Sequence, residues 1–102
     1  MNQDLDLKAQ VKQILKVVQE LAPGRSVELR IPPFAAIQCV GGSTHRRGTP
    51  PNVVEMSAET LLKLLENPVK WQQYCDLGSI SASGTNSNLG NLFAEVSKLM
   101  NS

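Results

Sequence analysis

Strict alternation of apolar and charged side chains over residues 26–31 constrains the fold more than any other feature of this chain. Val27, Leu29 and Ile31 fall on one side of an extended segment, and an acid and an arginine separate them. A period of two is typical of a strand whose sheet has one buried and one solvated face. We therefore expect a sheet that carries its helices on one face only.

Helical stripes and turn residues place the other elements around this strand. Apolar residues recur at helical spacing over residues 4–22, and Pro23-Gly24 ends that helix. Ser57 is expected to cap a second helix, and Ser87 or Asn88 is expected to cap the last one. The expected order is helix, three strands, two helices, strand and helix, at residues 4–22, 26–31, 35–40, 53–56, 57–65, 68–76, 80–82 and from about 88 to 100.

This order predicts an α+β fold of two layers, with a four-stranded, mainly antiparallel sheet and helices packed on one face. The first three strands can pair antiparallel, and the fourth returns to the sheet after the pair of helices. A chain of 102 residues supplies one hydrophobic core. We therefore expect a single domain over residues 1–102.

Composition excludes two broad classes of partner. Lys and Arg number 10 against 9 Asp and Glu, and this balance lacks the basic excess of a nucleic-acid-binding protein. No apolar run approaches the ~20 residues that a transmembrane helix needs, and the first residues lack the pattern of a signal peptide. The expectation is a cytoplasmic protein with no transmembrane segment and no nucleic-acid partner.

The sequence carries few of the side chains that catalysis or metal binding requires. Cys39 and Cys75 lie in apolar segments, so we expect both to be reduced. Together with His45 they could form a three-ligand zinc site, but their spacing matches no zinc signature. Ser43 lies near His45, but no nearby carboxylate would orient the imidazole. We therefore expect no catalytic residue, metal or cofactor. An enzyme that uses His45 is the minor alternative.

The least regular segment lies between the second and third strands. It holds His45, Arg46 and Arg47 between glycines and prolines, and it ends at Asn52. Two arginines beside a histidine could bind a phosphate or carboxylate through forked hydrogen bonds. Alternatively, an arginine caps backbone carbonyls or pairs with Glu55, while the prolines stiffen the loop.

Two motifs in this part of the chain resemble a known family. Residues 32–40 (PPFAAIQCV) and 45–55 (HRRGTPPNVVE) resemble the signature of the bacterial sterol-carrier-like family of actinobacteria. The second half is similar to the wider sterol carrier protein pattern at residues 57–65, 71, 78–84 and 89–99. The resemblance implies a sheet of about five strands with helices on one face. It also implies an apolar tunnel for fatty-acyl or sterol-like lipids.

The leading hypothesis is therefore a non-catalytic lipid carrier whose ligand is a fatty acid or another hydrophobic small molecule. The polar loop residues His45, Arg46, Arg47 and Asn52 would receive its head group. The apolar cavity is expected between the last helix and the sheet, lined by Leu62, Leu65, Trp71, Leu92, Phe93 and Met100. These six residues could instead fill a solid core, because periodicity does not distinguish the two. The alternative function is an accessory domain with such a core, which docks a protein partner through the basic loop.

Overall fold

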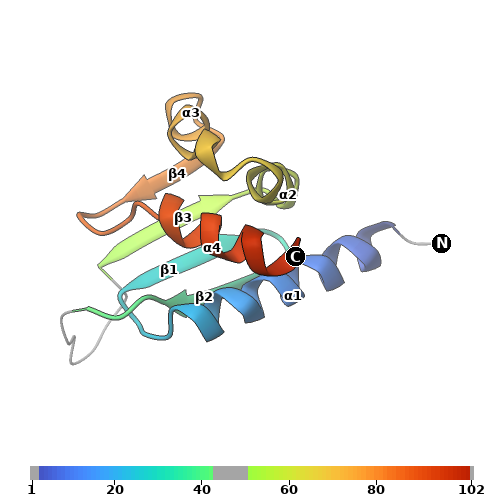
Figure 1. Cartoon of the computed structure of the whole chain (residues 1–102), viewed down its shortest axis with the longest axis horizontal. Coiled ribbons are helices and arrows are strands. Elements are labelled where there is room, and N and C mark those ends of the chain that lie inside the picture. The colour runs from blue at the N-terminus through green and yellow to red at the C-terminus, as the bar shows by residue number, and fades with distance from the viewer. Residues whose placement is uncertain (1–2, 43–50, 102) are drawn as a thin grey trace.

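The computed structural model describes residues 3–42 and 51–101 of the chain. The predicted order of helices and strands is confirmed, with boundaries close to the expected ones (Figure 1). The elements are α1 (Gln3–Leu21), β1 (Val27–Ile31), β2 (Ala35–Cys39), β3 (Asn52–Met56), α2 (Ala58–Glu66), the short 3-10 helix η1 (Pro68–Lys70), α3 (Trp71–Asp76), β4 (Ile80–Ser83) and α4 (Gly90–Met100).

The four strands form one mixed sheet in the order β2-β1-β3-β4. β1 pairs antiparallel with β2, and β3 pairs antiparallel with β4. The expectation of three antiparallel strands in a row is wrong for β3, which runs parallel to β1 with Val27 opposite Asn52. β2 ends and β3 begins at the same end of the sheet, because Cys39 and Asn52 both lie opposite Val27. The two strands flank β1 on opposite sides, so β3 runs in the same direction as β1.

Helices cover one face of this sheet, as predicted (Figure 1). α4 lies across the face and packs against α1 and α2, while α3 packs beside the edge strand β4. The core-facing side chains of β1 are fully buried. The hydrophobic core also takes in Val11, Leu15 and Val18 of α1, Leu61 and Leu64 of α2, and Phe93 and Val96 of α4.

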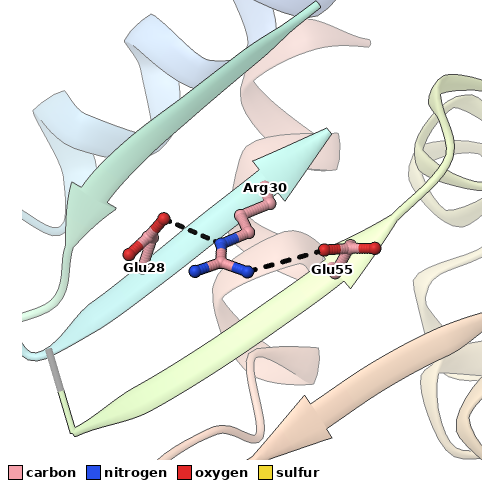
Figure 2. A network of polar contacts seen from close by, with 3 residues as sticks. All are labelled: Glu28, Arg30 and Glu55. Atoms are coloured by element: carbon pink, nitrogen blue, oxygen red, sulfur yellow. Dashed lines mark hydrogen bonds and ion pairs between the residues drawn. The ribbon is translucent and has the colours of Figure 1, made fainter. Parts of the chain in front are cut away.

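The other face of the sheet is polar, as the alternation in β1 predicts. Figure 2 shows that Arg30 lies between Glu28 on the same strand and Glu55 on β3. The Nε of Arg30 donates a hydrogen bond to Glu28 Oε2 at 2.8 Å, and its Nη1 lies 3.9 Å from Glu55 Oε1. The hydrogen bond from Arg30 and the charge of Glu28 raise the pKa of the guanidinium, so it stays charged. This face therefore meets solvent with paired charges.

Capping residues set where two of the helices begin. The Oγ of Ser57 accepts a hydrogen bond from the amide of Thr60 at 3.1 Å, which confirms the predicted cap of α2. α4 begins at Gly90, with Leu89 rather than Ser87 or Asn88 at the cap position. Asn88 still contributes, because its Oδ1 accepts from the amide of Gly90 at 2.9 Å.

Candidate functional site

The six residues predicted to line one cavity between the last helix and the sheet lie in three separate places. Leu62, Leu65 and Met100 meet at a surface cleft. Phe93 is fully buried and stacks on Trp71 inside the core. Leu92 lies at a different depression, near the beginning of α4. The structure therefore brings together half of the predicted set, and it places the rest elsewhere.

The cleft lies between α1, α2 and the end of α4, and we refer to it as the α1–α2–α4 cleft. Its volume is about 310 Å³. Apolar side chains line it from each helix, namely Ile14, Leu62, Leu65 and Met100. Its polar lining residues are Gln10, Gln13, Glu66 and Asn101. Leu62 and Met100 are half-buried, so part of their apolar surface is still available to a ligand.

Sequence reasoning missed the contribution of α1 to this cleft. Ile14 belongs to the apolar stripe of α1, which was not predicted to line a cavity. Gln10 lies one helical turn before Ile14, and Gln13 directly precedes it. Glu66 follows Leu62 by one turn of α2 and so shares its side of the helix. The spacing could have identified these polar neighbours, but only once the facing helices were known.

The beginning of α4 packs against η1 and against Trp71, the first residue of α3. The ring centroids of Trp71 and Phe93 are 6.2 Å apart with an interplanar angle of 22°, a stacked arrangement that adds to burial. A Cβ atom on Gly90 would lie 3.3 Å from Trp71 Cγ, so the absence of a side chain lets α4 come this close. Outside this contact lies a surface depression of about 470 Å³, which includes Trp71 and the exposed Val69. Trp71 and Phe93 therefore fill the core at this point.

Leu92 contributes to a third depression, of about 520 Å³, beside the end of β2. Its other apolar side chains are those of Ala22, Val40 and Leu89. The remaining lining comes from Gly41 and from the polar segment that leads into α4. This depression lacks the long aliphatic side chains from several helices that characterise the α1–α2–α4 cleft.

Of the predicted head-group residues, the structure describes only Asn52, because His45, Arg46 and Arg47 lie outside the described residues. Asn52 is only 2% exposed. Its Nδ2 donates to the backbone oxygen of Ser26 at 2.9 Å and to Ser26 Oγ at 3.3 Å, and its Oδ1 accepts from the amide of Asn86 at 2.9 Å. These bonds give Asn52 a structural role that joins β3 to the residue before β1 and to the segment before α4.

Gly84 is needed for this arrangement. Its φ is +104°, and a Cβ atom there would lie 2.2 Å from Asn52 Oδ1. Only glycine combines this backbone conformation with so close an approach. The turn after β4 is therefore built around the carboxamide of Asn52.

The residues that flank the basic loop lie at the opposite end of the sheet from the cleft (Figure 1). Cys39 at the end of β2 and Asn52 at the beginning of β3 both lie opposite Val27, the first residue of β1. The cleft instead involves α2, which begins just after β3 ends at Met56. The cleft therefore has a polar lining of its own, supplied by the helices that form it.

The two cysteines are free and lie at opposite edges of the sheet, Cys39 on β2 and Cys75 on α3 beside β4. Burial raises the pKa of the Cys39 thiol to about 11, and burial with the charge of Asp76 raises that of Cys75. Both thiols are therefore protonated near neutral pH. Within residues 3–42 and 51–101, no group of three His, Cys, Asp or Glu residues is placed to hold a metal ion. No helix in this part of the chain has the length and apolar character to cross a bilayer.

Comparison with known proteins begins with the fold. The solved structure of a UbiJ-SCP2 ubiquinone synthesis protein aligns with 100% of this chain and 98% of its own chain, with a TM-score of 0.55 and 13% sequence identity. At this identity the likeness shows the fold alone. Comparison with the curated proteins gives no match.

A family model described as bacterial SCP ortholog matches residues 4–94, which confirms the resemblance that the sequence motifs carry. The match extends from α1 into α4, so it includes the helices that form most of the cleft. The chain therefore belongs to the family of bacterial SCP orthologs, which are sterol carrier protein-like domains.

Proposed function

We propose that this chain is a non-catalytic carrier that holds the apolar chain of a fatty-acyl or similar ligand in the α1–α2–α4 cleft. Membership of the SCP family indicates a lipid-binding carrier domain. The observation that supports this particular site is the set of four apolar side chains that converge there from three helices. A volume of about 310 Å³ lies near the lower limit for small-molecule sites, which favours a single chain over a bulky ring system.

Binding would be driven by removing the ligand's methylene groups from water. Each buried CH₂ contributes about 0.8 kcal/mol, so affinity should rise with chain length until the cleft is filled. The half-exposed positions of Leu62 and Met100 leave the site open at the surface. A ligand could therefore enter and leave without unfolding of the core.

The lining of the cleft supports binding without bond chemistry. Of the described residues that line it, Glu66 alone carries an ionisable side chain. A general acid or base needs a reacting partner or a second group to orient the substrate. The amides of Gln10, Gln13 and Asn101 can supply hydrogen bonds but no nucleophile.

The basic loop belongs to a separate part of the proposal. We propose that Arg46 and Arg47, with His45, bind an anion. The grounds are their spacing in the sequence and the positions of the flanking strands. The variant Arg46→Gln/Arg47→Gln should weaken phosphate binding, measured by calorimetry, and leave ligand binding at the cleft unchanged. Equal phosphate binding by the variant and the parent chain would contradict this role.

The carrier function can be tested by NMR. The protein is titrated with 1-decanol and with decanoate, so that the charge of the head group does not decide the result. The amide signals of Leu62, Leu65 and Met100 should shift and saturate with one ligand bound per chain. Native mass spectrometry of the purified protein should show whether a lipid stays bound through purification.

Matched variants locate the site. Leu62→Gln should weaken binding by about tenfold, because it places a polar amide in the apolar lining. Leu77→Gln makes the same change at a residue that is 67% exposed and does not line the cleft, so affinity should not change. If neither 1-decanol nor decanoate gives saturable shifts, the proposed function is refuted. Equal effects of the two variants would refute it as well.

A further inference from the structure

We infer that the α1–α2–α4 cleft selects single-chain lipids with an uncharged head group, and that Glu66 discriminates against carboxylates. This inference rests on the proposed function, which it deepens by naming the class of ligand. Its basis is the contrast between the apolar residues of the cleft and the polar residues beside them.

Three of the four polar lining residues are carboxamides. Gln10 and Gln13 come from α1, and Asn101 follows the last residue of α4. A carboxamide offers both donors and an acceptor. A hydroxyl, ester or amide head group can therefore form hydrogen bonds with these residues without a net charge.

The fourth polar residue, Glu66, gives the cleft a negative charge. No lysine, arginine or histidine is among the described lining residues. The ion pairs of the described chain join Arg30 to Glu28 and Glu55 on the open face of the sheet, so neither of them neutralises Glu66. A fatty-acid carboxylate in the cleft would therefore lie near a like charge with no cation among the lining residues to compensate it, which is unfavourable.

The position of Glu66 in its helix strengthens this effect. Glu66 is the last residue of α2, and the C-terminal end of a helix carries a partial negative charge. The hydroxyl of Ser97 on α4 donates to the backbone oxygen of Leu65 at 2.6 Å, which fixes this end of α2 against α4. Lys63 is in the same last turn but does not line the cleft, so the side chain of Glu66 and the helix terminus are the negative groups on this side of it.

The experiment compares 1-decanol with decanoate at near-neutral pH, using the same NMR titration. The parent chain should bind 1-decanol about tenfold more tightly, a difference of about 1.4 kcal/mol. Glu66→Gln should reduce this difference by strengthening decanoate binding. Glu66→Lys should reverse the preference, because the new ammonium group can pair with the carboxylate.

Glu95→Lys is the matched control. Glu95 is an exposed residue of α4 that does not line the cleft, and its substitution changes net charge by the same amount. It should leave the preference for 1-decanol as it is in the parent chain. Equal responses to Glu66→Lys and Glu95→Lys would show that overall charge is responsible, and would overturn the inference.

The outcome separates this inference from the carrier function. If decanoate binds the cleft as tightly as 1-decanol and Glu66→Lys leaves the ratio unchanged, the selectivity is wrong and the carrier function stands. If neither ligand shifts the amides of Leu62, Leu65 and Met100, the carrier function fails and the inference fails with it.

Discussion

The two ends of α4 present the same apolar stripe to different surroundings. Near its beginning, Phe93 is fully buried and stacks on Trp71, and Gly90 allows the side chain of Trp71 to lie close to α4. At its end, Met100 is half-buried and faces α1 and α2 across a cleft. One helix therefore serves as core packing at one end and as a wall of the candidate binding site at the other.

The difference lies in the residues that face the helix. A tryptophan ring fills the space near the beginning of α4, whereas glutamines and a glutamate lie beside the apolar residues at its end. Long polar side chains keep their ends in water and do not close a gap as an aromatic ring does. The contrast teaches that binding capacity in this fold depends on the helices opposite α4 rather than on α4 itself.

The strongest way to break this comparison is to remove the ring at the filled end. Phe93→Ala should lower the free energy of unfolding by about 3–5 kcal/mol, because it leaves a cavity beside Trp71. Urea denaturation monitored by tryptophan fluorescence measures the change. Val69→Ala, at a residue that is 88% exposed, should cost no more than about 0.5 kcal/mol. Similar losses in the two variants would mean that Phe93 is not part of a tightly packed core.

A smaller loss is expected at the polar anchor before α4. Asn52→Ala removes the hydrogen bonds to Ser26 and to the amide of Asn86, and should cost about 1–3 kcal/mol in unfolding free energy. Affinity of the folded protein for 1-decanol should not change, because Asn52 lies at the end of the sheet away from the cleft. Asn91→Ala, at an exposed position of α4, is the control. A parallel loss of 1-decanol affinity in Asn52→Ala would contradict a purely structural role.

The smallest effect on stability is expected at the open end, where it sharpens the comparison. Met100→Ala should lower the free energy of unfolding by less than about 1 kcal/mol, because its side chain is only half-buried. It should nevertheless weaken 1-decanol binding roughly tenfold, since the lost methylene and thioether contacts belong to the cleft. Calorimetric unfolding and the NMR titration measure the two effects. A stability loss as large as that of Phe93→Ala would show that this end of the helix is core as well.

The secondary structure and layers were predictable because each depends on local pattern. The alternation in β1 predicted a sheet with one polar face, and the Glu28–Arg30–Glu55 contacts lie on that face. The parallel pairing of β3 with β1 was not predictable in the same way. The direction of β3 depends on the end of β1 at which β3 begins, and the residues of β3 do not determine this.

The candidate site was predictable only in part. Leu62, Leu65 and Met100 were expected to line a cavity because the family resemblance implies one between apolar elements, and they do share the cleft. Phe93 belongs to the same apolar stripe of α4 as Met100, but its side chain packs inside the core. Spacing tells which side of a helix is apolar, but the space between facing helices depends on side chains far away in the sequence, such as Ile14.

The parallel pairing of β1 and β3 has a consequence for how much the chain can vary in length. Residues 40–51 connect two strands that lie on either side of β1, with both attachment points at one end of the sheet. Strands in a sheet are about 4.8 Å apart, so these points are separated by about 10 Å, which about three or four residues could span. Doubling the length of a loop costs only about 0.6 kcal/mol. Insertions and deletions in this connection should therefore be tolerated. The sheet thus places little constraint on the length of the loop that carries His45, Arg46 and Arg47.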